Sequence, residues 1–251
     1  MPAKDQKELL NEKIHIPGRK TYEEVFDKRT LQELYDLMKD GIIDTLESPI
    51  STGKEAKVFK GTRKDGTLVA VKIMRLNTAV FRKYRKYIEG DHRFKDLPGG
   101  NKMIYAWTKK EFANLRRMHE GGIRVPEPYA YSKNILIMEY LSHEGYPAPM
   151  MKDVDLKLKY MTNIGEQVID YIDTLYNDLD MVHGDLSEFN ILIAEGYPYL
   201  IDVSQSVFLN HPISSELLER DINNFVRYFG EENGMDTSVE EIKEKIGIED
   251  G

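Results

Sequence analysis

The stretch Val182–Asn190, VHGDLSEFN, decides how the rest of the chain is interpreted. Asp185 stands five residues before Asn190, and an apolar run follows directly. A Glu-Gly turn then leads into a second run, which ends at Asp202. This order of loop, strand, turn, strand and acid predicts a short hairpin that brings Asn190 close to Asp202.

Asn190 and Asp202 would offer two oxygen ligands at the end of that hairpin. Mg2+ on a nucleotide takes one or two protein oxygens beside phosphates and waters, so the pair is a candidate metal site. Asp185 is left to orient or deprotonate an attacking hydroxyl group, as the aspartate of a kinase catalytic loop does at the same spacing. On these nine residues alone, the alternative is a surface loop rich in turn-forming Asp, Ser and Asn.

The composition narrows the class of protein. The chain has 251 residues, of which 41% are hydrophobic, enough for one large domain or two lobes. It has no cysteine, which excludes disulfides and thiolate metal sites, and its net charge of -8 argues against a protein that coats nucleic acid with its whole surface. Without a signal peptide or a membrane-spanning stretch, a soluble cytoplasmic protein is expected.

Apolar periodicity predicts the elements before the central stretch. Residues 1–20 are polar and predict no regular structure, whereas residues 21–41 predict a helix that ends at Gly41. The strands and helices expected after it are Ser48–Thr52, Ala56–Thr62, Leu68–Met74, the helix Tyr105–His119, the strands Tyr129–Tyr131 and Asn134–Tyr140, and the helices Asp155–Leu179, Ser214–Phe229 and Ser238–Ile246.

Lys72 lies inside the third strand with apolar residues on both sides. A buried lysine is costly unless a carboxylate or phosphate meets it. On the helix Tyr105–His119, Glu111 falls on the apolar stripe and should face inward. Lys72 is therefore expected to pair with Glu111, the alternative being a glutamate at a partly exposed edge of the helix.

Residues 79–102 predict a long loop with a short basic segment. Its cations, Arg82, Lys83, Arg85 and Lys86, alternate with the aromatic residues Phe81, Tyr84 and Tyr87. Such a mixture can contact RNA phosphates and stack on bases, so residues 81–95 are a candidate RNA contact. The alternative is a solvated helix whose aromatic side chains pack inward.

The segment Ser51–Ala56, STGKEA, contains a Gly-Lys pair but is not a P-loop. That motif requires Gly at position 48 and Ser or Thr at position 55, where this chain has Ser48 and Glu55. As a turn between strands ahead of Lys72, the segment instead predicts a loop that covers phosphates, with Ile50 and Ser51 among the nucleotide-binding residues.

Four segments in this order, STGKEA, VAVK, MEY and HGDLSEFN with IDVSQS, closely resemble the RIO family of atypical serine/threonine protein kinases, in particular the short archaeal-like form of its first subfamily. The resemblance runs from about residue 26 to residue 229. It implies an α+β, two-lobed protein-kinase-like fold without an activation loop or peptide-docking helices. Its parts would be a helical extension (1–47), an N-lobe (48–141) and a C-lobe (142–251).

The resemblance also implies ATP and Mg2+ as cofactors, with Mn2+ as an alternative metal. Asp185 would be the catalytic acid/base residue, with Asn190 and Asp202 as metal ligands. Asp202 would in addition be a phosphoacceptor that forms an aspartyl-phosphate. The remaining roles would be phosphate binding by Lys72 with Glu111, adenine binding by Glu139 and Leu141, and anchoring of the catalytic loop by Asp221.

Two departures from ordinary protein kinases affect regulation. Gly184 stands where those enzymes usually have the arginine that pairs with a phosphorylated activation loop, and Val203-Ser204 replace the Phe-Gly after the metal-binding aspartate. Regulation by activation-loop phosphorylation is therefore not expected.

The function implied by the resemblance is an autophosphorylating kinase or ATPase that acts in small-ribosomal-subunit maturation, with pre-small-subunit particles as partners. One alternative is a small-molecule phosphotransferase of the aminoglycoside or choline kinase type, which shares the HGD loop. The other is a ribosome-assembly binding factor that uses ATP hydrolysis only as a release switch.

Overall fold

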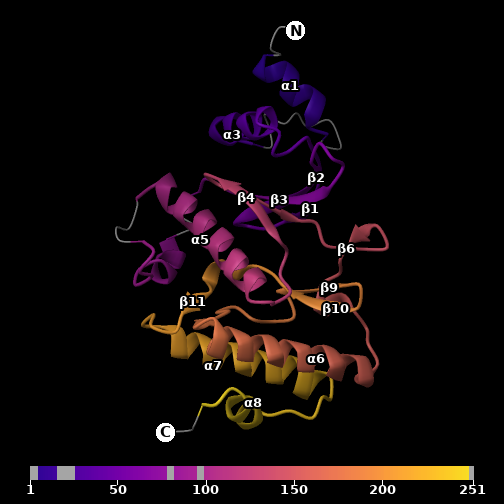
Figure 1. Ribbon diagram of the computed structural model, residues 1–251, viewed down its shortest axis with the longest axis vertical. Coiled ribbons are helices and arrows are strands. Elements are labelled where there is room, and N and C mark those ends of the chain that lie inside the picture. The colour runs from indigo at the N-terminus through magenta and orange to yellow at the C-terminus, as the bar shows by residue number, and fades with distance from the viewer. Residues whose placement is uncertain (1–4, 16–25, 78–81, 95–98, 249–251) are drawn as a thin grey trace. The chain divides into compact units, whose positions relative to one another are not determined.

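The structure is a computed structural model that describes residues 5–15, 26–77, 82–94 and 99–248. The chain divides into two compact units (Figure 1). Unit 1 comprises residues 1–85, 98–112 and 128–140, and unit 2 comprises residues 86–97, 113–127 and 141–251.

Unit 1 is built on a five-stranded antiparallel sheet with the order β1-β2-β3-β5-β4. The strands are β1 (Thr45–Thr52), β2 (Ala56–Thr62), β3 (Leu68–Met74), β4 (Pro128–Ser132) and β5 (Ile135–Glu139). All five strands predicted from the sequence are present. A turn with Gly66 at φ +84° joins β2 to β3, which explains the Asp-Gly pair there.

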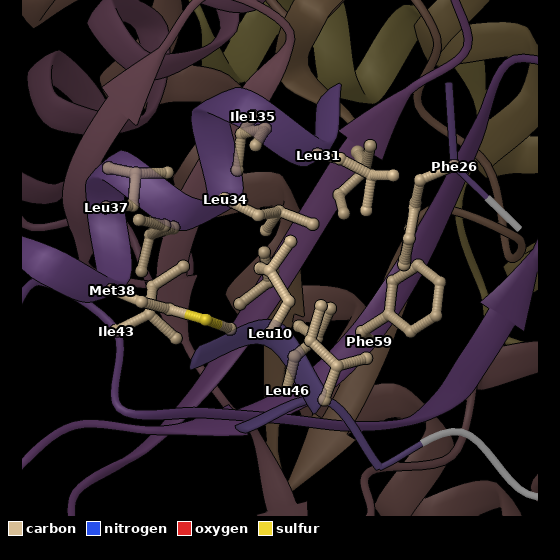
Figure 2. Close-up of a cluster of buried hydrophobic side chains, with 14 of the residues drawn as sticks. Leu10, Phe26, Leu31, Leu34, Leu37, Met38, Ile43, Leu46, Phe59 and Ile135 are labelled. Carbon is tan, nitrogen blue, oxygen red and sulfur yellow. The ribbon is translucent and has the colours of Figure 1, made fainter. Parts of the chain in front are cut away.

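Two helices pack against this sheet and supply much of the core of unit 1. Buried side chains of α1 (Gln6–Lys13) and α3 (Lys28–Lys39), among them Leu10 and Leu34, meet Leu46 and Phe59 of the strands (Figure 2). The expectation that residues 1–20 lack regular structure is therefore wrong for α1, whose single buried leucine was too weak a periodic signal. The predicted start of the second helix, at residues 21–25, lies outside the described residues.

Helix α5 (Asn101–Glu120) begins four residues before its predicted start, and the boundary between the two units falls inside it. Before it, Arg82–Tyr87 forms a short 3-10 helix. No helix among the described residues is long and apolar enough to cross a lipid bilayer.

Unit 2 is mostly helical and contains short antiparallel strand pairs. Its helices are α6 (Leu158–Asp173) and α7 (Ser214–Phe225), each continued by a π-helical turn, and α8 (Val239–Lys245). The strand pairs are β6 (Ser142–His143) with β7 (Tyr146–Pro147), β8 (Met181–Val182) with β11 (Val207–Phe208), and β9 (Ile191–Ala194) with β10 (Tyr197–Leu200). A sheet-based unit and a helical unit make the chain α+β, as predicted.

The units do not follow one cut along the chain. Residues 1–47 group with the sheet in unit 1, and residues 86–97 and 113–127 group with unit 2. The division into an extension and two lobes at residues 47 and 141 therefore remains a prediction about lobes rather than a description of these units.

Candidate active site

In unit 1, Lys72 pairs with Glu111, as the sequence predicts. Val69, Val71 and Ile73 of β3 face the core formed with α1 and α3, so alternation directs Lys72 to the opposite face of the sheet. There its Nζ lies 2.6 Å from Oε1 of Glu111, a residue of α5 that is only 1% exposed. The pair satisfies two charges that would otherwise be costly to bury.

The register of the sheet places Ser51 in the same cross-strand row as Lys72. Ser51 lies opposite Val58, and Val58 lies opposite Lys72. Residues directly opposite one another point to the same face, so Ser51 and Lys72 share a face two strands apart, roughly 10 Å. Ile50 sits beside Ser51 at an irregularity in the pairing of β1 with β2. This arrangement is compatible with the predicted nucleotide contacts of both residues.

The basic segment of the long loop differs from its predicted role in one respect. Tyr84 and Tyr87 are buried, and the ring of Tyr84 lies 4.9 Å from that of Trp107. Tyr84 also hydrogen-bonds Glu55 of the STGKEA segment. Stacking of these two tyrosines on bases is therefore wrong, and inward packing is correct, because both rings are buried.

Three cations of that segment lie at the surface, and one of them, Lys83, pairs with Glu55 at 3.3 Å. The residues Lys83, Arg85 and Lys86 are exposed. The first and last residues of the predicted RNA contact, Phe81 and Lys95, lie outside the described residues.

In unit 2, the predicted hairpin forms and brings Asn190 beside the residue before Asp202. Strands β9 and β10 pair with Ile191 opposite Leu200, and the backbone N–H of Ile201 donates to the carbonyl of Asn190 at 2.9 Å. Asp202 then adopts φ +57°, the left-handed region that is uncommon for residues other than glycine. Such conformations persist only where the surrounding contacts hold them.

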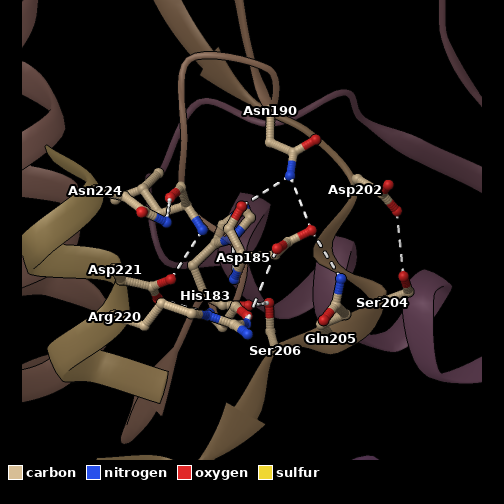
Figure 3. A network of polar contacts seen from close by, with 12 residues as sticks. His183, Asp185, Asn190, Asp202, Ser204, Gln205, Ser206, Arg220, Asp221 and Asn224 are labelled. Carbon is tan, nitrogen blue, oxygen red and sulfur yellow. Dashed lines mark hydrogen bonds and ion pairs between the residues drawn. The ribbon is translucent and has the colours of Figure 1, made fainter. Parts of the chain in front are cut away.

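The carboxylate of Asp185 lies between amide donors from two directions (Figure 3). Nε2 of Gln205 donates to its Oδ2 at 2.7 Å, and Nδ2 of Asn190 donates to the same oxygen at 3.2 Å. The Asn190 amide also donates to the Asp185 carbonyl at 2.7 Å. Nη2 of Arg220 lies 3.9 Å from the other carboxylate oxygen, Oδ1.

Asn190 and Asp202 fit a hard divalent cation. Because the amide nitrogen of Asn190 is used by Asp185, its side-chain oxygen is turned away from that carboxylate (Figure 3). Among the described residues no cluster of three or more His, Cys, Asp or Glu could hold a metal. One amide oxygen and one carboxylate instead match an ion that completes its shell with phosphates and water, as Mg2+ does.

Asp221 of α7 anchors the backbone of the loop, as predicted. Its carboxylate accepts the N–H groups of Gly184 at 2.6 Å and Leu186 at 2.8 Å. Burial raises the pKa of Asp221 to about 7, and the two backbone hydrogen bonds oppose this shift. Arg220, its neighbour, donates to the Gly184 carbonyl. The loop is thus held on both sides of Asp185.

His183 contributes structure rather than charge. Burial lowers the pKa of His183 to about 4, so its ring is neutral near pH 7. Its Nδ1 accepts the backbone N–H of Asp185 at 3.3 Å, and its carbonyl accepts the Ser206 hydroxyl at 2.7 Å.

Glu139 and Leu141, the predicted adenine contacts, belong to different units and are described separately. Glu139 ends β5 in unit 1, opposite Val69 of β3. Leu141 is buried in unit 2, where its carbonyl accepts the N–H of Ala148 at 3.1 Å.

The sequence did not predict two residues that shape the site, Gln205 and Asn114. Asn114 of α5 is fully buried, and its Nδ2 donates to the carbonyls of Val203 at 2.7 Å and Ser206 at 3.1 Å. Asn114 lies on a helix far along the chain from these partners, so no local motif reveals the contact. The signal for Gln205 was its place three residues after Asp202 within IDVSQS.

Comparison with known proteins gives matches along most of the chain. Residues 57–242 match the RIO domain family. The RIO-type serine/threonine-protein kinase Rio1 of Haloferax volcanii is 39% identical over 92% of this chain and 79% of its own length. The protein of the same name from Methanocaldococcus jannaschii is 41% identical over 89% of this chain and 77% of its own length.

A human relative, the serine/threonine-protein kinase RIO1, is 38% identical over 91% of this chain, which spans only 41% of the human protein. Among solved structures, the Rio2 kinase–ADP/Mg2+-phosphoaspartate complex from Chaetomium thermophilum matches with a TM-score of 0.65 at 23% identity, covering 88% of this chain and 67% of that one. This likeness confirms the predicted two-lobed, kinase-like fold.

We predict that Asp221→Ala lowers the free energy of unfolding by about 3 kcal/mol, because two buried N–H groups lose their acceptor. Asp221→Asn, which keeps one acceptor oxygen, should lose less. Chemical denaturation of both variants measures this, with Glu219→Ala on the exposed side of α7 as the control. An Asp221→Ala protein as stable as the control would contradict the anchoring role.

The stability difference between wild type and the Asp221→Asn variant should also depend on pH. The folded-state pKa of Asp221, about 7, lies above its usual value of 3.8. Its contribution to stability is therefore fully present below the unfolded pKa and is lost as the pH rises through about 7. Asp221→Asn cannot titrate, so its deficit relative to wild type should shrink over that rise.

Proposed function

Because the chain belongs to the RIO family of serine/threonine-protein kinases, we propose that it transfers the γ-phosphoryl group of ATP to a serine or threonine hydroxyl, with Asp185 as the catalytic acid/base residue. The observation that carries this proposal is the Asp185 carboxylate, which side-chain amides orient on a loop whose backbone is fixed by Asp221. A general base needs this kind of fixed geometry.

In the proposed reaction the acceptor oxygen attacks the γ-phosphorus in line, and its proton passes to Asp185. The new P–O bond forms as the bond to ADP breaks. Lys72, held by Glu111, would bind the α- and β-phosphates. Mg2+ on the nucleotide, held by Asn190 and Asp202, would neutralise the charge that develops on the transferred group. The adenine would contact backbone groups of Glu139 and Leu141.

A covalent step at Asp202 is a further part of this proposal. A carboxylate oxygen of Asp202 would attack the γ-phosphorus, forming an aspartyl-phosphate and releasing ADP. Two observations support it. The residue closes the hairpin that carries Asn190, and the structurally similar Rio2 kinase was solved as a phosphoaspartate complex.

The biological setting we propose is small-ribosomal-subunit maturation in the cytoplasm, with precursor particles as partners. Its support is the resemblance to the first RIO subfamily and the exposed cations Lys83, Arg85 and Lys86. The small-molecule phosphotransferase alternative shares only the HGD loop, whereas the RIO match extends over residues 57–242.

Replacement of the base tests the central claim. Asp185→Ala should leave ATP affinity nearly intact and lower turnover at least about a hundredfold, because proton transfer to a positioned base contributes that much. Titration with ATP and a phosphate-transfer assay measure the two quantities. Turnover equal to wild type would remove Asp185 from the mechanism.

Replacement of the other aspartate tests metal binding and the covalent step together. Asp202→Ala should abolish Mg2+-dependent ATP binding and any acid-labile phosphoprotein, since both need that carboxylate. Labelling with γ-phosphate-labelled ATP, followed by acid and base treatment, detects the phosphoprotein. If the variant retained an acid-labile phosphoenzyme, another residue would be the acceptor.

Sedimentation tests the proposed partner. We expect the protein to co-sediment with small-subunit precursors, and more so with a non-hydrolysable ATP analogue than with ATP if turnover promotes release. Charge reversal at Lys83, Arg85 and Lys86 should weaken binding and its dependence on salt. Wild-type sedimentation of that variant would exclude the basic segment as the contact.

A further inference from the structure

We propose that Gln205 is the positioning residue of the catalytic carboxylate: its side-chain amide holds Asp185 in the orientation that receives the acceptor proton, and Gly184 is glycine so that Gln205 can approach. This inference rests on the proposed function of Asp185. It concerns a residue outside the HGDLSEFN stretch, on the short turn Val203–Gln205 that follows Asp202.

The first support is the hydrogen bond itself. Gln205 Nε2 lies 2.7 Å from Asp185 Oδ2, shorter than the 3.2 Å from Asn190 Nδ2 to the same oxygen. Asn190 is also a proposed metal ligand, so its amide serves two partners. Gln205 is the donor whose contact with Asp185 does not depend on metal coordination.

The second support is the rigidity of the turn that carries Gln205. Ser206, the next residue, donates its hydroxyl to the His183 carbonyl at 2.7 Å and its backbone N–H to the Val203 carbonyl at 3.2 Å. Asn114 donates to the carbonyls on both sides of Gln205, those of Val203 and Ser206. Val203 and Ser206 are themselves fully buried. The backbone of Gln205 is therefore held from α5 and from the catalytic loop.

The third support is the space beside Gly184. A Cβ atom at this position would lie 2.9 Å from the Gln205 carbonyl oxygen and 3.2 Å from Leu217 Cδ1. Gly184 also has φ +80°, which side chains rarely adopt. Any side chain at position 184 would push the turn Val203–Gln205 away from the loop that carries Asp185. The Gln205 side-chain amide would then move away from the Asp185 carboxylate.

The chemistry suits an amide. As a neutral donor, Gln205 orients the carboxylate through one oxygen, Oδ2. The other oxygen, Oδ1, lies 3.9 Å from Nη2 of Arg220 and is the one proposed to receive the proton of the acceptor hydroxyl. Small losses of orientation are expensive in such reactions, because a displacement of about 1 Å can cost on the order of a hundredfold in rate. The role is one of positioning, since Gln205 acts through Asp185.

The test compares donors at this position. Gln205→Met has a similar length but no donor, and we expect its kcat to fall about tenfold or more, with ATP affinity and melting temperature unchanged. Gln205→Glu should fall further, because a second carboxylate would face Asp185. Gln205→Lys, which restores a donor, should retain more activity than either. The matched control is Gln167→Met, which removes a glutamine whose amide bonds Asn163 on α6.

A second measurement separates positioning from a general structural effect. In an Asp185→Ala background, Gln205→Met should cause no further loss, because the residue it orients is gone. A wild-type kcat for Gln205→Met, or a loss matched by lower ATP affinity or by an equal loss in the Asp185→Ala background, would overturn the inference. If Asp185→Ala itself left turnover unchanged, the proposed function would fail, whatever Gln205 does.

Discussion

The structure of the candidate site depends on one buried carboxylate that accepts two backbone N–H groups. Asp221 accepts the backbone N–H groups of Gly184 and Leu186, the neighbours of Asp185 on either side, so the backbone around Asp185 cannot shift without breaking a buried hydrogen bond. Leaving such a donor unsatisfied costs about 1 to 3 kcal/mol, a large share of the stability of a domain. The loop geometry is therefore tied to the folding of α7, the helix that supplies Asp221.

The same logic governs unit 1, where Lys72 lies on the face of the sheet opposite α1 and α3 and pairs with Glu111. Glu111 comes from a helix, Lys72 comes from a strand, and each charge makes the burial of the other tolerable. The register of the sheet places Ser51 on the same face as Lys72, two strands away. In each unit a buried carboxyl group thus fixes part of the candidate site: Glu111 holds Lys72 in unit 1, and Asp221 holds the backbone beside Asp185 in unit 2.

Prediction from the sequence succeeded where the signal was local or periodic. The hairpin after Asn190, the inward-facing Glu111 and the five strands follow from spacing, alternation and turn residues. It failed for α1, whose polar surface hides one buried leucine. It also missed Asn114, because the contact joins positions separated by 89 residues in the chain and leaves no local pattern. The aromatic residues of the basic segment were ambiguous, since sequence alternation does not say which way a ring points.

The left-handed backbone at Asp202 favours a few residue types at that position. At φ +57° glycine, asparagine and aspartate are tolerated best, because glycine has no Cβ to approach the following carbonyl oxygen and the short side chains of asparagine and aspartate can hydrogen-bond locally. Of those three, aspartate alone has both a negative charge and a nucleophilic oxygen. Glutamate would supply the same chemistry, and Glu144 and Glu195 of this chain adopt the same left-handed backbone, so the conformation favours the shorter acid without excluding the longer one.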